Sequence, residues 1–424
     1  MSRKSDQVWD ELELTYSRWG LNEIPFSESV TTFSEAQLRE VFTGREDQLR
    51  QVLNLFRGRE RKRVLIYGGV GIGKTALMLE VLSVLKRKLQ DTLTAYISLP
   101  ANTDLATAAI VALAREMKDD EWAQHQLNLM GLHPQTRPVE KSAMAKAGLG
   151  GTGIETEEKT VPVNKPEIPA LSFEDLLNRA LQKYARVVIA IDDLDKQDPA
   201  RARELLRDAQ GMLKGRAWFI LTGHPSGLTR DILTRDLGLF DLALELTQLD
   251  QKTTNEMLIN YLNSARPEHS RRLLDDPLAV RPFTPETARM LCERSEGIPR
   301  WLNRLGSYVL IKASELHTDT ITPEILQAGF EYADQQLRGQ TGLTPEDYYV
   351  LDLVLEKGVL SEAQISLADL DRVKAKEFNE ILPILDKLVD LDLIRRLPSE
   401  RAMEYEPSPL ILRKLSDADD QPSE

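Results

Sequence analysis

The sequence has little of several residue types, and each shortage excludes a class of protein. It has one cysteine, Cys292, so no disulfide can form within the chain. Its five histidines are scattered, and no Cys/His cluster has the spacing of a zinc site. No run of about 18 apolar residues occurs, so we expect no membrane-spanning helix and no membrane partner.

Basic residues are also in the minority. The 424-residue chain has 54 Lys+Arg against 67 Asp+Glu, a formal net charge of −13. This balance argues against non-specific coating of DNA, which needs a basic surface, but it permits a local basic patch. The start of the chain, MSRKSDQVWDELELTY, has no apolar core of the secretory kind. We therefore expect a cytoplasmic globular protein of two or three domains.

The stretch that organises the chain is Val64–Leu79, VLIYGGVGIGKTALML. Its first four apolar residues predict a buried parallel strand, and apolar residues at helical spacing after Thr75 predict a helix. Between them lies the P-loop pattern of Gly68, four residues and then Gly73-Lys74-Thr75. The glycines let the backbone wrap around a phosphate chain, and the helix N-terminus favours anions. We predict that the nucleotide is bound by Gly68, Gly69, Val70, Gly71, Ile72, Gly73, Lys74, Thr75 and Ala76.

Two side chains of this loop have distinct predicted roles. Lys74 is expected to reach the β- and γ-phosphates, and the Thr75 hydroxyl is expected to bind Mg²⁺. The predicted cofactors are therefore ATP and Mg²⁺.

Four more apolar runs predict strands at 93–99, 187–191, 217–222 and 242–246. The run at 187–191 ends in Asp192-Asp193, and a carboxylate at the tip of a central parallel strand faces the crevice where open α/β sheets bind ligands. We predict that Asp192 holds Mg²⁺ through water and that Asp193 orients or polarises the attacking water.

Other parts of this half are less regular. Residues 1–15 are polar and are expected to be loosely held, and the aromatic segment 16–26 either packs as a strap against a neighbouring domain or is a surface loop held by its aromatics. A helix is predicted at 105–117. Residues 119–170 lose periodicity and are interpreted as an insertion, in which Gly148–Gly153 forms either an exposed hairpin or a disordered loop. A helix is predicted again at 173–184.

From residue 251 onward the pattern predicts helices, at 253–265, 284–295, 299–316 and 323–337. Gly297-Ile298-Pro299-Arg300 places proline at the first helical position with an arginine behind it. In a helical lid over the nucleotide, Arg300 would lie at the phosphates. The alternative is an exposed arginine in the first turn, where a basic residue is slightly unfavourable.

The last unit is predicted to be a winged helix. Helices are expected at 345–356, 362–367 and 375–391, with two short strands around 398–401, and Pro383 is expected to kink or split the third helix. Residues 340–415 contain 10 Lys+Arg and 15 Asp+Glu, a net charge of −5. This unit is therefore expected to add little non-specific affinity for DNA, and docking of a protein is at least as good an interpretation.

In this order, the motifs resemble those of an AAA+ ATPase of the initiator type. The chain is similar to replication-origin ATPases and to ATPases that regulate target choice in DNA transposition. Phe42-Thr-Gly44-Arg45-Glu46 resembles the glycine-arginine-glutamate box, Gly68–Thr75 resembles Walker A and Val187–Asp193 resembles Walker B. The segment from Trp19 to Phe26 resembles the start of secretion- and transposition-linked ATPases.

The resemblance implies roles for three more residues. Thr222, at the end of the fourth strand, falls at the polar sensor 1 position, and Gly297–Arg300 resembles sensor 2. Arg235 falls where an arginine finger is expected, with Arg230 as the alternative. Two departures stand out. Asp193 is one methylene shorter than the glutamate of the family, which implies slow or partner-stimulated turnover. The insertion is longer than the family core requires and implies a specialised partner.

The predicted fold is α/β, a P-loop AAA+ domain with a parallel sheet, followed by a helical lid and a C-terminal winged helix. The expected parts are an N-terminal strap at 1–41, the ATPase domain at 42–250 with its insertion at 119–170, the lid at 251–338, the winged helix at 343–415 and a disordered acidic tail at 416–424.

The predicted function is binding and hydrolysis of Mg-ATP, coupled to head-to-tail self-assembly and to engagement of DNA or a DNA-associated protein. A partner protein is expected at the winged helix or the insertion. Transposition, replication initiation and anti-phage defence all fit these motifs. Two alternatives remain: a nucleotide switch that does not hydrolyse ATP and serves as a signalling scaffold, and an interaction adaptor in which the nucleotide is structural.

Overall fold

The structure, a computed structural model, describes residues 4–27, 30–58, 60–132, 168–194, 199–223, 239–339, 342–397 and 403–411. Within these ranges, none of the helices combines the length and the apolar character needed to cross a membrane. The chain divides into two compact units. The sheet unit comprises 47–68 and 77–245, and the lid unit comprises 1–46, 69–76 and 246–424.

The sheet unit is built on a five-stranded sheet. Its strands are β1 (Arg63–Gly68), β2 (Thr92–Ser98), β3 (Arg186–Asp192), β4 (Trp218–Gly223) and β5 (Leu242–Leu246), in the order β2-β3-β4-β1-β5. The β1–β4, β2–β3 and β3–β4 pairs are parallel. All five predicted strands are confirmed, each within one residue at either end. The apolar runs are continuous because the central strands are buried on both faces.

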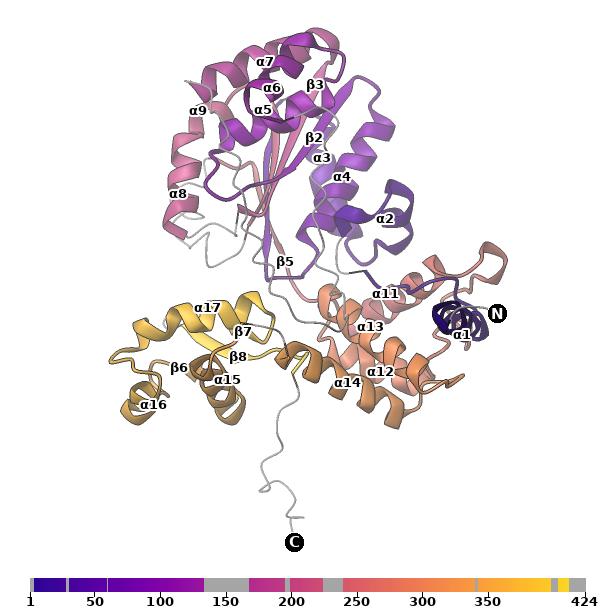
Figure 1. Cartoon of the computed structure of the whole chain (residues 1–424). Coiled ribbons are helices and arrows are strands. Elements are labelled where there is room, and N and C mark those ends of the chain that lie inside the picture. Colours follow the sequence, from indigo (N-terminus) through magenta and orange to yellow (C-terminus); the bar gives the residue numbers. More distant parts are fainter. Residues whose placement is uncertain are drawn as a thin grey trace. The chain divides into compact units, whose positions relative to one another are not determined.

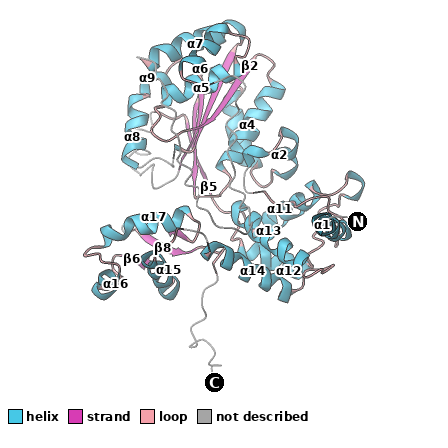
Figure 2. Ribbon diagram, in the orientation of Figure 1, coloured by secondary structure: helices cyan, strands magenta, loops and turns pink. Residues whose placement is uncertain are grey.

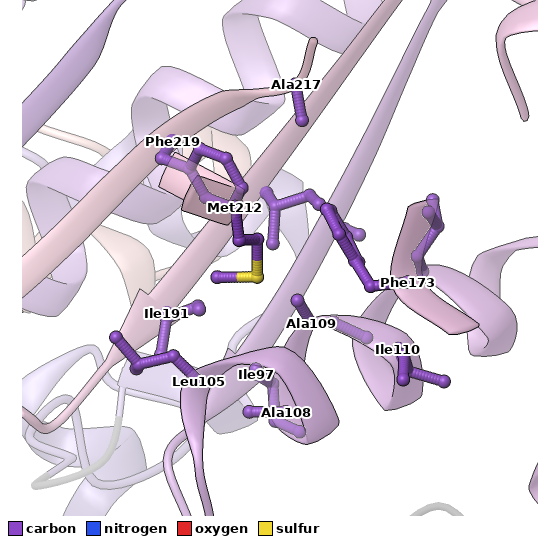
Figure 3. Packing of buried hydrophobic residues seen from close by; sticks show 14 of the residues in the cluster. Ile97, Leu105, Ala108, Ala109, Ile110, Phe173, Ile191, Met212, Ala217 and Phe219 are labelled. Atoms are coloured by element: carbon purple, nitrogen blue, oxygen red, sulfur yellow. The ribbon is translucent and has the colours of Figure 1, made fainter. Parts of the chain in front are cut away.

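Helices cover both faces of this sheet (Figure 1). They are α3 (Glu46–Phe56), α4 (Lys74–Lys88), α5 (Leu105–Glu116), α6 (Glu121–Leu129), α7 (Pro169–Lys183), α8 (Pro199–Asp208) and α9 (Gln210–Leu213). On one face, Ile110 of α5, Phe173 of α7 and Met212 of α9 pack with Phe219 of β4 in one apolar layer (Figure 3). On the other, Phe56 stacks on Trp218 with ring centroids 5.0 Å apart.

The lid unit contains the helices that the sequence predicts after residue 251. They are α11 (Gln251–Ser264), α12 (Pro285–Arg294), α13 (Pro299–Glu315) and α14 (Pro323–Arg338), with η3 (Glu268–Ser270) between the first two. Asp250, just before α11, accepts a hydrogen bond from the Thr253 N–H at 2.8 Å, which caps the helix. The N-terminal part of the chain adds α1 (Lys4–Trp19), η1 (Val30–Thr32) and α2 (Glu35–Val41) to the same unit.

The aromatic segment 16–26 packs on the lid. The Trp19 indole N–H donates to the Thr318 carbonyl at 2.8 Å, and its side chain is buried. Phe26 lies so close to α13 that a Cβ on Gly306 would be 2.5 Å from its ring. Only glycine permits that approach.

The winged helix is the last part of the lid unit, and Figure 2 shows that it combines helices with a small sheet of its own. Its elements are α15 (Pro345–Lys357), β6 (Leu360–Ser361), α16 (Leu367–Arg372), η4 (Phe378–Ile381), α17 (Leu382–Asp390), β7 (Ile394–Leu397) and β8 (Glu404–Pro407). The strands form an antiparallel sheet in the order β6-β8-β7. The predicted third helix is split, because Pro383 lies in the first turn of α17 and the residues before it form the separate turn η4.

Three local predictions were wrong. Residues 4–15, which were expected to be loosely held, belong to α1, and Thr15 is buried. A helix, α6, lies inside 119–170, where Asp120 accepts from the Ala123 N–H at 3.0 Å and begins it. The helix expected at 362–367 begins at Leu367, since Ser366 and Asp369 form its capping box. The Gly148–Gly153 segment, the turn at 398–401 and the tail 416–424 lie outside the described residues.

Candidate nucleotide site

The P-loop follows directly from the carboxyl end of β1. Strand β1 ends at Gly68 and helix α4 begins at Lys74, so the five residues between them form the loop. Gly71 and Gly73 have φ angles of 73° and 101°, in the left-handed region that favours glycine. Concave loops of this kind present backbone N–H groups to an anion, and the N-terminus of α4 adds its dipole.

Arg300, in the first turn of α13, lies against this loop. Its backbone N–H donates to the Gly71 carbonyl at 3.3 Å. A Cβ on Gly71 would lie 2.6 Å from the Arg300 Cβ, so the two backbones meet at a distance that only glycine permits. The first turn of α13 is thus fixed on the P-loop.

Arg45, in the glycine-arginine-glutamate box, also contacts the P-loop, through a backbone carbonyl of the loop. Its guanidinium is buried and donates to the carbonyls of Ile72 at 3.2 Å and Thr247 at 2.6 Å. Burial lowers the pKa of Arg45 to about 10, so it remains cationic at neutral pH. The sequence identified this box but not the side chain's contact with Ile72.

The Lys74 side chain folds back over the loop that precedes it. Its ammonium group is buried and donates to the Gly69 carbonyl at 3.1 Å. A cation is therefore held beside the P-loop backbone, where a phosphate chain would need one.

A second group of site residues lies in the sheet unit, at the carboxyl edge where β1, β3 and β4 end. Asp192 is the last residue of β3 and is buried. The buried Thr222 hydroxyl donates to Asp192 Oδ1 and accepts from the Asp193 N–H at 3.1 Å. The structure thus brings together the three residues that the sequence assigned to Walker B and sensor 1.

Asp193 has an unusual backbone conformation. Its φ is 63°, in the left-handed region, which aspartate tolerates better than most residues. Its Oδ2 accepts a hydrogen bond from the Ser98 hydroxyl at 2.5 Å. The carboxylate is therefore fixed in direction by a neighbouring strand.

Sequence reasoning missed two members of this cluster, both on β2. The Tyr96 hydroxyl donates to Asp192 Oδ2 at 3.1 Å, and Ser98 holds Asp193. Ser98 is the register partner of Asp192 in the β2–β3 pair. Polar residues at the end of a predicted buried strand were the available signal, because carboxyl ends of adjacent parallel strands meet at one edge.

The residues present fit a magnesium nucleotide. The left-handed glycines, the buried Lys74 and the adjoining Arg300 suit a phosphate chain, and an Asp192 carboxylate oriented by two hydroxyls suits a hard divalent cation. Arg235 and Arg230, the two candidates for an arginine finger, lie outside the described residues.

Comparison with known proteins agrees with this geometry. Residues 41–216 match the family described as AAA ATPase domain. No curated protein sequence matches the chain.

Solved structures match over most of their length. The Aeropyrum pernix Orc1 protein, solved in complex with DNA, aligns over 88% of this chain and 90% of its own, with a TM-score of 0.50 and 15% identity. Cdc6p from Pyrobaculum aerophilum aligns over 89% and 95%, with a TM-score of 0.44 and 16% identity. The Thermotoga maritima RuvB Holliday junction branch migration motor aligns over 89% and 94%, with a TM-score of 0.41 and 18% identity. Residues 41–216 thus match an AAA ATPase domain, and the chain shares the fold of the Aeropyrum pernix Orc1 protein, here with a P-loop domain, a helical lid and a C-terminal winged helix.

Proposed function

We propose that this chain binds Mg-ATP at its P-loop and hydrolyses it. Residues 68–76 enclose the phosphates, Lys74 neutralises the β- and γ-phosphates, and Arg300 adds a second cation. Thr75 and Asp192 bind Mg²⁺, and Asp193 orients the attacking water. The observation that carries the proposal is the hydrogen-bonded cluster of Asp192, Thr222 and Asp193, at the edge of the sheet from which β1 leads into the P-loop.

The test measures binding and turnover separately on the full chain. Equilibrium binding of ATP with Mg²⁺ is followed by calorimetry, and phosphate release is followed at saturating ATP. We expect ATP to bind and phosphate to be released slowly, because Asp193 is shorter than the glutamate usual in the family. Absence of ATP binding by the folded chain would disprove the proposal.

One observation favours a second candidate, a nucleotide switch that does not hydrolyse ATP. Asp193 is already bound by the Ser98 hydroxyl at 2.5 Å, and this contact restrains the carboxylate that must orient water. ATP binding with no phosphate release, with or without DNA, identifies the switch. Phosphate release that a Ser98→Ala change accelerates identifies an ATPase restrained by this contact.

The site is proposed to be completed by a second subunit. Arg235 precedes β5 in the sequence, and in a head-to-tail assembly it would supply charge to the neighbour's nucleotide, with Arg230 as the alternative. Such an arginine can contribute about 10³–10⁵ in rate. We expect Arg235→Ala and Asp193→Asn each to be inactive alone and to regain part of the activity when mixed. A mixture that co-assembles with ATP and stays inactive excludes Arg235 as a residue acting in trans.

Assembly is proposed to engage DNA or a DNA-associated protein, in a process such as replication initiation, transposition or anti-phage defence. The Orc1 protein with the same fold was solved in complex with DNA, which supports DNA as a partner. Two basic residues of this winged helix form ion pairs within the chain: Arg395 pairs with Glu296 at 2.7 Å, and the exposed Lys374 pairs with Glu346 at 3.1 Å. We therefore infer that the winged helix docks a protein rather than reading bases. Binding of duplex DNA by the full chain that is lost on removal of residues 343–415 would contradict this inference.

A further inference from the structure

Arg300 connects the P-loop to the winged helix. Its backbone N–H bonds the Gly71 carbonyl at 3.3 Å, while its guanidinium Nη1 lies 3.8 Å from Oδ2 of Asp392. Asp392 belongs to the winged helix, in the turn between α17 and β7. The backbone of Arg300 thus contacts the P-loop, and its guanidinium lies beside a carboxylate of the winged helix.

The turn that contains Asp392 has a backbone hydrogen bond of its own. Its backbone N–H donates to the Val389 carbonyl at 2.9 Å, and its φ of 55° is one that Asp and Asn adopt more readily than other side chains. Its side chain is only 10% exposed. The carboxylate is therefore fixed by the turn and faces α13.

Two arginines on the same face of α13 share this carboxylate, and they are held unequally. Arg304, one turn after Arg300, donates to Asp392 Oδ2 at 2.7 Å and is 18% exposed. Arg300 approaches the same oxygen only to 3.8 Å and is 39% exposed. Electrostatic attraction between charges falls with distance and with solvent screening, so Arg304 forms the stronger ion pair with Asp392. Arg300 forms the weaker pair, which a competing anion can break.

Other contacts fix the winged helix on the lid around this point. The Arg395 guanidinium lies 5.1 Å from the centre of the Trp301 ring and pairs with Glu296 at 2.7 Å. Arg294 of α12 donates to the Ile411 carbonyl at 2.9 Å. Withdrawal of Arg300 would therefore loosen one contact of an interface that the others and Arg304 keep together.

We propose that Asp392 is a positioning residue for Arg300, and that its carboxylate competes with the phosphates of the nucleotide for the guanidinium. This inference rests on the proposed function, since it assumes that the P-loop binds ATP. ATP draws Arg300 away from Asp392, and a partner that displaces the winged helix releases Arg300 to the phosphates. Linkage requires ATP to weaken the Arg300–Asp392 contact by the same free energy by which that contact weakens ATP binding.

Nucleotide affinity of full-length variants tests the competition. Asp392→Asn keeps a residue that tolerates the turn and removes the charge, and we expect it to tighten ATP binding about twofold to fivefold, the range for a partly exposed ion pair. In an Arg300→Ala background the same change should leave ATP affinity unaltered, because the guanidinium for which Asp392 and the phosphates compete is absent. Glu346→Gln is the control: it removes an acid of the winged helix that pairs with Lys374 of the same domain.

The second measurement needs no variant. Amide hydrogen exchange of residues 391–397 in the wild-type chain should become faster when ATP is added. ATP binding that Asp392→Asn leaves unchanged or weakens, an Asp392→Asn effect that persists without Arg300, or exchange that ATP does not alter would each overturn the inference alone. Failure of the wild-type chain to bind ATP overturns the proposed function and the inference together.

Discussion

The P-loop and the acidic cluster at the end of β3 obtain their shapes in different ways. The loop's shape comes from backbone: left-handed conformations at Gly71 and Gly73, and carbonyls of Ile72 and Gly71 that are bound by Arg45 and Arg300. The cluster's shape comes from hydrogen bonds between side chains on neighbouring strands.

This difference predicts how each part fails. A site shaped by backbone is disrupted by an added Cβ, whereas a site shaped by hydroxyls and carboxylates is disrupted when one polar atom is removed. We also expect the P-loop to govern nucleotide affinity and the acidic cluster to govern turnover. Substitutions in the two parts should therefore separate binding from hydrolysis.

The largest expected effect is that of Lys74→Ala. Loss of the P-loop ammonium leaves the phosphates without their principal cation, and we expect affinity for ATP to fall by about 100-fold or more, the size of a buried charge-assisted contact. Lys88→Ala is the matched control, since it removes an exposed lysine from the other end of α4. Calorimetry with Mg-ATP measures both. Unchanged affinity in Lys74→Ala would refute the assignment of the loop.

Asp193→Asn should give the opposite separation. Asparagine tolerates the left-handed backbone at this position, so the fold and ATP affinity should be retained. The amide cannot orient or polarise water as a carboxylate does, and phosphate release should fall by about 10²-fold or more. Turnover at the wild-type rate would show that another residue orients the water.

Gly71→Ala and Gly69→Ala test whether backbone shape determines the loop. An alanine at 71 must adopt a φ of 73° and would lie 2.6 Å from the Arg300 Cβ. At 69, an added Cβ meets nothing within 4 Å. Strain of about 1–3 kcal/mol at 71 corresponds to a loss of about fivefold to 150-fold in ATP affinity, while Gly69→Ala should stay within about threefold of wild type. Equal effects of the two changes would contradict the comparison.

The same difference explains what the sequence could predict. The P-loop lies within one short segment, so its pattern, strand and helix were read together. Arg300 was predicted as a site residue from the local pattern Gly297-Ile298-Pro299-Arg300. Tyr96 and Ser98 were missed because their role depends on the pairing of β2 with β3. That pairing joins residues about 90 positions apart in the sequence. Asp392 was missed for the same reason: its partners lie on α13, and nothing in its own segment indicates them.

Thr222→Val tests the acidic cluster as a structural unit. Thr222 is buried, and its hydroxyl bonds both Asp192 Oδ1 and the Asp193 N–H. Valine keeps the volume and removes one hydrogen bond from each partner, which should lower the free energy of unfolding by about 1–3 kcal/mol. Thr222→Ser restores the hydroxyl and should recover most of the loss. If valine and serine are equally stable in urea unfolding, the hydroxyl does not hold the cluster.

The smallest effect is expected in the winged helix, where a similar polar cluster is only half-buried. Asp369 accepts from the Ser366 hydroxyl at 2.7 Å, from the Tyr349 hydroxyl at 2.7 Å and from the Ser366 N–H at 3.0 Å. These hydrogen bonds lower the pKa of Asp369 to about 2 from its ordinary 3.8, and the bond from the Ser366 hydroxyl has the largest effect.

A carboxyl whose pKa is depressed on folding stabilises the protein above its unfolded pKa and loses that stabilisation as pH falls through the folded value. The difference in thermal unfolding midpoint between wild type and Asp369→Asn should therefore be constant above about pH 4 and shrink between about pH 4 and pH 2. Because solvent screens this cluster, the difference at neutral pH should be smaller than that produced by Thr222→Val. A difference that stays constant down to pH 2 would show that Asp369 acts through its shape and not through its charge.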